Sequence, residues 1–177
     1  MAETRVISVI GKKDAGKTTL VVAMAQDFVR RGRRVGTIKH GHHPALVDQE
    51  GKDTWRHFNE GRVLRTMIES PGQRVTFEHS DGMADPVALV RQSFLDVDIV
   101  IVEGFKRAEI PKIEVHRKAV HATPLFDPDD ASASQWIAMV SDERKMQLPF
   151  PVFTFTDTAW LPSLMHFAWE RALVVER

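Results

Sequence analysis

Apolar residues at the start of the chain follow first a strand pattern and then a helix pattern. Arg5 to Ile10 is a β-branched run with little alternation, typical of a strand that is covered on both faces. From Thr18 apolar residues recur at spacings of three and four, which predicts a helix that ends at Gly32. Arg34 to Ile38 predicts a second strand. The order and size of these segments indicate a βαβ unit of a parallel sheet.

The rest of the chain continues this mixture of strands and helices. Ser70-Pro71-Gly72 is a turn signal between two strand-like runs, so we expect a hairpin there. Without repeats or a linker, the pattern predicts a single three-layer α/β domain over residues 1–177, with a mostly parallel sheet and a β-hairpin insertion. Further strands are expected at 63–68, 73–79, 98–102, 112–116, 136–140 and 152–155, and helices at 52–60, 85–95 and 158–172.

Composition and charge exclude several classes of protein. Lys plus Arg and Asp plus Glu both number 24, and this neutral balance argues against a nucleic acid or an anionic membrane as the main partner. The absence of cysteine excludes disulfide scaffolds, thiolate metal sites and a cysteine nucleophile. Apolar runs fall short of the ~18 residues of a membrane helix, and the first residues do not resemble a leader. We therefore expect a soluble intracellular protein.

The segment between the first strand and the first helix matches the phosphate-loop pattern of Gly, four residues, Gly-Lys-Thr. Its glycines allow successive backbone amides to point at an anion, and the helix that follows adds its positive end. The Lys17 ammonium can reach the β and γ phosphates, and the Thr18 hydroxyl can bind Mg²⁺. The predicted nucleotide-binding residues of this segment are Gly11, Lys12, Lys13, Asp14, Ala15, Gly16, Lys17, Thr18 and Thr19.

Mg²⁺ bound to a nucleotide also needs a carboxylate at the end of a neighbouring strand. Glu103 stands where the expected strand at 98–102 ends, and Gly104 lets the backbone lie near a γ phosphate. Asp98 begins that strand and should lie at the opposite end of the sheet. We therefore predict that Glu103 is a metal ligand, bonded through water, and the catalytic partner of Lys17. Asp48 is a further candidate for the Mg²⁺ shell, with helix capping as the alternative.

Two other positions are candidates for nucleotide contact. Lys39 and His40 follow the second strand, at the end where ligands bind in open α/β sheets; a polar loop with locally bonded histidines is the alternative. The sequence has no Asn-Lys-x-Asp motif for reading guanine. Asp142, after the strand at 136–140, is the best substitute, because a carboxylate accepts from guanine N1–H and its N2 amine. A solvent-facing loop aspartate is the alternative for Asp142.

Four short motifs together resemble one known family. They are Gly36-Thr-Ile-Lys-His40, Asp48 with Gly51-Lys52-Asp53, Val102-Glu103-Gly104-Phe105-Lys106 and Pro111-Lys112-Ile113-Glu114-Val115. In this order and spacing the chain resembles molybdopterin-guanine dinucleotide biosynthesis protein B (MobB), from Val6 to about Arg117. This chain departs from the family pattern at phosphate-loop residues 12–14, which are charged here. Its C-terminal third matches the family poorly.

The resemblance implies a cytoplasmic P-loop protein that binds GTP with Mg²⁺, hydrolyses it weakly and forms a homodimer. It would assist a molybdenum cofactor guanylyltransferase of the MobA type, which attaches GMP to molybdopterin or its molybdenum form. No water-activating residue or arginine finger stands out, so we expect slow hydrolysis. The main alternative is a small-molecule kinase that uses ATP on the same scaffold. A nickel-insertion GTPase and an interaction module that no longer binds nucleotide are further alternatives.

Overall fold

The computed structural model describes residues 3–41, 43, 48–82, 84–143 and 145–176. The chain divides into two compact units, one formed by Met1–His40 with Asp85–Arg177 and the other by Gly41–Ala84. The first unit contains the phosphate loop, and the second contains the hairpin. The single nucleotide-binding domain expected over residues 1–177 stays a prediction.

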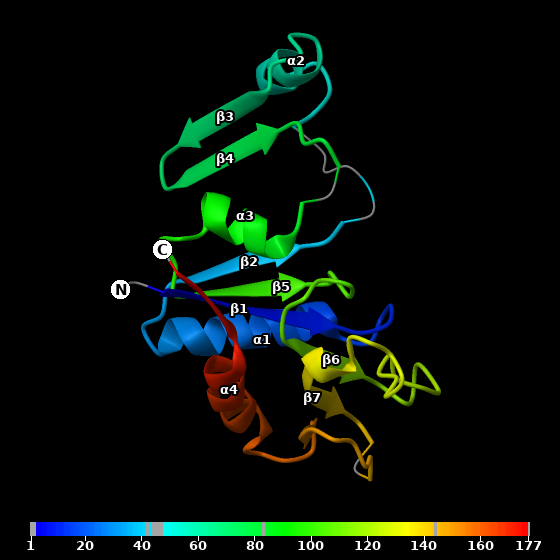
Figure 1. Cartoon of the computed structure of the whole chain (residues 1–177). Helices are drawn as coiled ribbons and strands as arrows, with labels where there is room; N and C mark the ends of the chain where they lie inside the picture. Colours follow the sequence, from blue (N-terminus) through cyan, green and yellow to red (C-terminus); the bar gives the residue numbers. More distant parts are fainter. Residues whose placement is uncertain (1–2, 42, 44–47, 83, 144, 177) are drawn as a thin grey trace. The chain divides into compact units, whose positions relative to one another are not determined.

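The first unit is built on a seven-stranded sheet with the order β2-β5-β1-β6-β7-β8, and β9 pairs with β1 beside this path (Figure 1). Every neighbouring pair on the path is parallel, as the sequence predicts. The strands are β1 (Glu3–Ile10), β2 (Val35–Lys39), β5 (Ile99–Glu103), β6 (Lys112–His116), β7 (Trp136–Ser141), β8 (Val152–Thr154) and β9 (Leu173–Glu176).

Strand β9 was not expected from the sequence. It runs antiparallel to β1 and pairs Glu3–Val6, whereas β6 pairs with β1 from Ser8 onward. Only Ala172 separates its four residues from the last helix, and they carry no turn signal and too little alternation to be recognised as a strand. The pairing with β1 therefore depends on tertiary structure rather than on local sequence.

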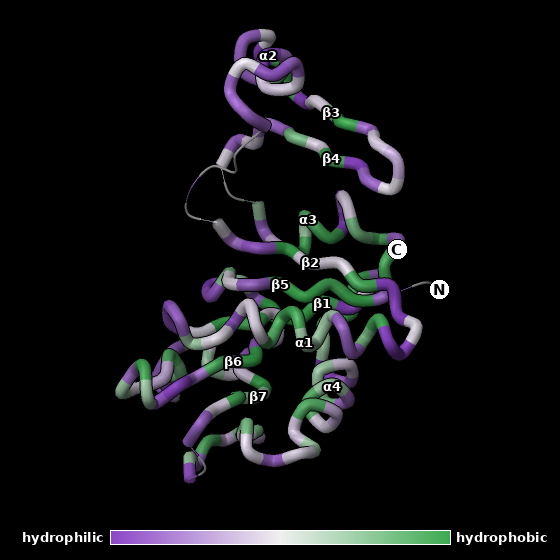
Figure 2. Tube along the Cα trace, turned by 180° about the vertical axis from the view of Figure 1, so that it is seen from behind, coloured by the Kyte–Doolittle hydropathy of each residue, from purple (hydrophilic) through white to green (hydrophobic). Residues whose placement is uncertain are grey.

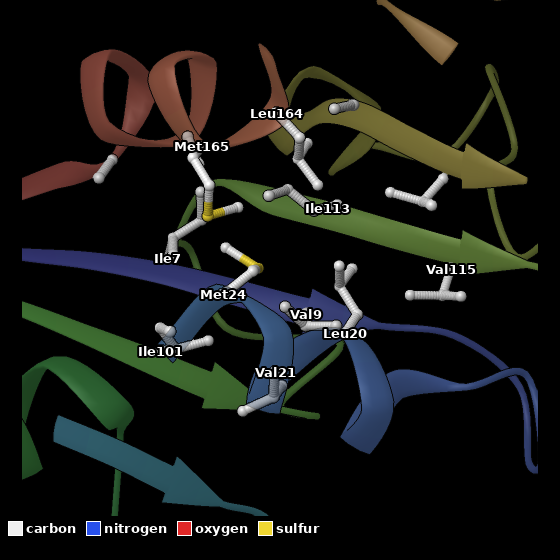
Figure 3. Close-up of a cluster of buried hydrophobic side chains, with 14 of the residues drawn as sticks. Ile7, Val9, Leu20, Val21, Met24, Ile101, Ile113, Val115, Leu164 and Met165 are labelled. Carbon is white, nitrogen blue, oxygen red and sulfur yellow. The ribbon is translucent and has the colours of Figure 1, made fainter. Parts of the chain in front are cut away.

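Helices cover both faces of the sheet, which confirms the three-layer prediction. Helices α1 (Lys17–Arg30) and α4 (Trp160–Arg171) pack on one face, where Figure 3 shows the side chains of Met24 and Met165 between helices and strands. Helix α3 (Pro86–Ser93) packs on the other face, with Val90 fully buried. The hydrophobic colour of β1 and β5 in Figure 2 fits strands buried from both sides. No helix among the described residues is both long enough and apolar enough to cross a membrane.

The second unit contains the predicted hairpin and one helix. Strands β3 (Arg65–Ser70) and β4 (Gln73–Glu78) pair antiparallel around the turn at Pro71 and Gly72, and α2 comprises Asp53–Asn59. Phe58 of α2 is buried, and its ring stacks on His79 at a centroid distance of 3.9 Å. The hairpin insertion is thus confirmed, with its own small apolar contact to α2.

Candidate functional site

The phosphate loop leaves β1 after Ile10 and ends where α1 begins at Lys17. Gly11 has no substitute in this position, because a Cβ there would lie 2.5 Å from the backbone oxygen of Val115. Gly16 caps the N-terminus of α1 with a left-handed φ of 100°. The loop therefore lies against the end of β6, and the positive end of a 14-residue helix follows it.

Lys17 is surrounded by charges of both signs. Its Nζ donates a hydrogen bond to the Lys12 carbonyl oxygen at 2.8 Å. Burial lowers the pKa of Lys17, Glu103 opposes this shift, and the nearby Lys106 and Lys39 lower the pKa further. Asp14 also opposes the shift, so Lys17, Lys39 and Lys106 lie with two carboxylates, Glu103 and Asp14, in a distribution of charge that favours an incoming anion.

Glu103 and Thr18 meet because of the register of the parallel strands. Glu103 pairs with Val9 of β1 and with Lys39 of β2, at the ends of the strands that carry the phosphate loop and Lys39. The Thr18 hydroxyl donates to the Glu103 carboxylate, 3.1 Å from Oε1 and 3.0 Å from Oε2. Lys39 Nζ lies 3.6 Å from Glu103 Oε1. The predicted residues Lys17, Thr18, Lys39 and Glu103 are therefore brought together.

A hydroxyl beside one carboxylate fits the coordination of Mg²⁺, which takes few protein ligands and keeps several waters. Thr18 and Glu103 are the residues that would hold it. Within the part of the chain that the structure describes, no group of three or more His, Cys, Asp or Glu side chains forms a metal cluster. The donor set suits a metal that arrives with nucleotide phosphates.

His40 is hydrogen-bonded to Glu103, whereas Asp48 belongs to the other unit of the chain. The His40 amide donates to the Glu103 carbonyl at 2.9 Å, and its ring lies 4.8 Å from that of Phe105. Gly104 has a φ of 94°, and a Cβ there would come within 2.9 Å of His40 Cβ. Asp48 belongs to the second unit, where its Oδ1 accepts from the Gln49 amide. The predicted place of Asp48 in the Mg²⁺ shell stays a prediction.

A cavity of about 400 Å³ opens beside the phosphate loop. It is lined by Gly16 and Thr19 at the start of α1 and by a second group made of Arg117, Asp142, Phe155 and Trp160. The rings of Phe155 and Trp160 meet edge-to-face with centroids 5.5 Å apart. Sequence reasoning found only Asp142 of the second group, because the other three residues carry no motif.

Asp142 is held as an ionised acceptor in this cavity. Burial raises the pKa of Asp142, but hydrogen bonds from the Lys118 and Ala119 amides outweigh it, and the net pKa is lowered. The Lys118 amide lies 2.7 Å from Oδ1, and the Ala119 amide lies 3.4 Å from Oδ2. Asp142 is an exposed residue whose carboxylate is hydrogen-bonded to the chain segment after β6.

That segment, which we call the β6–β7 connection (residues 117–135), also contacts the phosphate loop. Lys12 Nζ donates to the backbone oxygen of Thr123 at 2.7 Å and lies 3.1 Å from its hydroxyl. His121 Nε2 lies 2.6 Å from the Lys13 carbonyl oxygen. The Lys12 side chain is therefore hydrogen-bonded to the β6–β7 connection.

Strand β6 carries two buried charged residues that sequence reasoning did not assign. Lys112 is fully buried, and Glu114 is 1% exposed. Lys112 Nζ donates to the carbonyl oxygens of Ala108 and Ile110 and to the Gln135 side chain. Burial lowers the pKa of Lys112 to about 8. In the sequence, Lys112 and Glu114 alternate with apolar residues, as in an ordinary half-exposed strand. The sequence therefore does not indicate that they are buried.

Comparison with known proteins identifies the family. Residues 6–142 match the sequence model of the family MobB, molybdopterin guanine dinucleotide synthesis protein B. The chain belongs to the MobB family. It is 35% identical over 134 residues to the molybdopterin-guanine dinucleotide biosynthesis adapter protein of Haemophilus influenzae, covering 70% of this chain and 69% of that protein. The Escherichia coli adapter protein is 32% identical over 112 residues, covering 62% and 63%.

Solved structures support the same family at the level of the fold. A crystal structure of a MobB protein homolog from Bacillus stearothermophilus is 26% identical, with a TM-score of 0.65 over 94% of this chain and 99% of that one. The Bacillus subtilis MobB structure, at 21% identity and a TM-score of 0.67, shares the fold. MobB membership supports a role in molybdopterin guanine dinucleotide biosynthesis and does not favour the small-molecule kinase alternative.

The depressed pKa of Lys112 predicts how stability depends on pH. Between about pH 8 and its ordinary pKa of 10.5, the folded chain has lost a proton that the unfolded chain retains, so rising pH favours the folded state. The free energy of unfolding of the natural protein, measured relative to Lys112→Met by urea titration, should rise by about 1 kcal/mol per pH unit in this range. A difference that stays constant from pH 7 to 10 would contradict the assignment.

Proposed function

We propose that this chain binds GTP with Mg²⁺ and serves as a cytoplasmic adapter in molybdopterin guanine dinucleotide synthesis. Its partner is a molybdenum cofactor guanylyltransferase of the MobA type, which attaches GMP to molybdopterin or its molybdenum form. The observation that carries the proposal is the phosphate loop beside both the Thr18–Glu103 pair and a cavity that contains Asp142. MobB membership supports the pathway.

The phosphate loop and the lysines around Glu103 account for the triphosphate. Backbone amides of residues 11–16 and the N-terminus of α1 supply hydrogen-bond donors and positive potential. Lys17 is bonded to the loop's own Lys12 carbonyl, a contact that a phosphate oxygen replaces with a stronger charge-assisted bond. Mg²⁺, held by Thr18 and through water by Glu103, would neutralise phosphate charge.

The cavity beside the phosphate loop is the proposed binding site of the guanine base. An ionised carboxylate accepts only, which suits the N1–H and N2 amine of guanine, whereas adenine presents a ring-nitrogen acceptor on the same edge. The hydrogen bonds that lower the pKa of Asp142 keep it in this form. Phe155 and Trp160 offer aromatic faces to a planar base. We therefore propose that Asp142 reads guanine.

A titration of GTP against ATP with Mg²⁺ tests nucleotide binding. GTP should bind more tightly than ATP, and Lys17→Ala should weaken both by about tenfold or more, because a charge-assisted bond is lost. Asp142→Asn should weaken GTP selectively, because one acceptor becomes a donor that faces the N–H groups of guanine.

Val22→Ala, an exposed change on α1, is the matched control and should leave both affinities unchanged. A preference for ATP that Asp142→Asn leaves unaltered would contradict the proposal.

A transfer assay tests the adapter role. Purified guanylyltransferase should form molybdopterin guanine dinucleotide faster with this chain than without it, and Lys17→Ala should remove most of the gain. The chain alone should hydrolyse GTP slowly, at roughly 10⁻⁴ to 10⁻² s⁻¹, as unassisted GTPases do. Equal transfer rates with and without the chain would contradict the adapter role, and fast hydrolysis by the chain alone would contradict slow intrinsic turnover.

The hairpin provides a surface for the proposed homodimer. On one face of β3 and β4, Met67 lies opposite Thr76 and is flanked by the ion pairs Arg65–Glu78 and Glu69–Arg74. The order of charges along β3 is the opposite of that beside it along β4, so two copies of this face related by a twofold axis parallel to the strands place each arginine opposite a glutamate. Met67 is 52% exposed. Sedimentation should show a dimer that Met67→Asp weakens; a monomer at all concentrations would contradict this.

A further inference from the structure

Glu114 is a buried carboxylate, and its hydrogen-bond partners among the described residues lie in the β6–β7 connection or directly after it. It is 1% exposed, and its oxygens accept from the Leu125 amide at 2.5 Å, the Phe126 amide at 3.0 Å and Trp136 Nε1 at 3.0 Å. Burying a carboxylate is costly unless such donors compensate it. Three N–H groups provide that compensation, and two of them belong to the backbone of the connection.

Three residues before Leu125 are hydrogen-bonded to residues of the candidate nucleotide site. The Lys118 amide binds Asp142, His121 binds the Lys13 carbonyl, and Thr123 binds the Lys12 ammonium. Together with the bonds to Glu114, residues 118–126 are therefore fixed at four places. At three of these places the partner is a residue that we assign to nucleotide binding, namely Asp142, Lys13 or Lys12.

The connection has little regular structure of its own. Its described elements amount to a single 3₁₀ turn at Ala133–Gln135, and residues 117–126 have few backbone hydrogen bonds among themselves. The bonds to Lys12 and Asp142 are exposed to solvent, whereas Glu114 is buried. Hydrogen bonds in a low-dielectric interior are stronger than those in water, so Glu114 is the firmest anchor of this segment.

We propose that Glu114 is a positioning residue for nucleotide binding: it anchors the β6–β7 connection, and the connection holds Asp142 and the phosphate loop in their binding geometry. This inference rests on the proposed function. Glu114 itself lies under the connection and contacts no nucleotide in this account. Its effect on affinity is transmitted through residues 118–126.

The substitution Glu114→Gln keeps the shape of the side chain but replaces one acceptor oxygen by an amine, which then faces an N–H donor. We expect the affinity for GTP to fall by about tenfold, as for the loss of a hydrogen bond to a charged group. We also expect hydrogen exchange across residues 118–126 to accelerate. The second variant, Leu125→Pro, removes one donor to Glu114 and leaves Glu114 in place. It should show the same two effects.

A double-mutant cycle separates positioning from general destabilisation. If Glu114 acts through Asp142, the losses of GTP affinity in Glu114→Gln and Asp142→Asn should be non-additive, with the double variant losing less than their product. The control is Thr4→Val, which removes a buried hydroxyl bonded to Val97 at 2.9 Å. It should lower stability without changing GTP affinity. Urea titration of each variant verifies folding.

The outcomes distinguish this inference from the function on which it rests. A natural protein that binds no GTP overturns both. Normal GTP binding with unchanged affinity in Glu114→Gln and Leu125→Pro overturns the positioning role alone. An equal loss of GTP affinity in Thr4→Val also overturns it, because Glu114 would then act only on overall stability. Losses that simply multiply in the double variant overturn the route through Asp142.

Discussion

The parallel pairing of β5 between β1 and β2 is the constraint on which the rest of the first unit depends. This register places Glu103 beside Val9 and Lys39, so the last residue of β5 lies next to the phosphate loop and the end of β2. Because β5 is buried along its whole length, a slip by one residue would exchange its two apolar faces. The hydrophobic core on both sides of the sheet thus fixes the position of the one carboxylate beside Thr18.

The electrostatics of the site follow from that position. In the structure, Lys17 is bonded to the Lys12 carbonyl, Lys12 to Thr123, and Lys39 lies near Glu103. Each ammonium therefore has an oxygen partner from the chain itself. We propose that a triphosphate displaces the contacts of Lys17 and Lys39, while the bond of Lys12 to Thr123 stays in place, and that Thr18 and Glu103 would hold Mg²⁺ together with the phosphates. The pKa of Lys17 is lowered chiefly by burial and further by Lys106 and Lys39, and a bound triphosphate would offset the repulsion from these two lysines.

The sequence predicts those parts of the molecule that local patterns determine. Buried strands, the hairpin turn and the phosphate loop depend on residues close in the chain, and the meeting of Thr18 with Glu103 follows from the general rule that parallel strands end at one edge. The burial of Lys112 and Glu114 could not be predicted in this way. It depends on a connection without helix or strand pattern that folds over β6, and on partners that lie up to 23 residues away. The aromatic wall of the cavity likewise comes from Phe155 and Trp160, which carry no motif.

The most direct test of the account is a crystal structure of the chain with Mg²⁺ and a non-hydrolysable GTP analogue. We predict triphosphate in the loop of residues 11–16, the metal between Thr18 and a phosphate oxygen, and the guanine edge within hydrogen-bond distance of Asp142. A base bound outside the cavity of Phe155 and Trp160, or a metal with no contact to Thr18 and no water shared with Glu103, would contradict it.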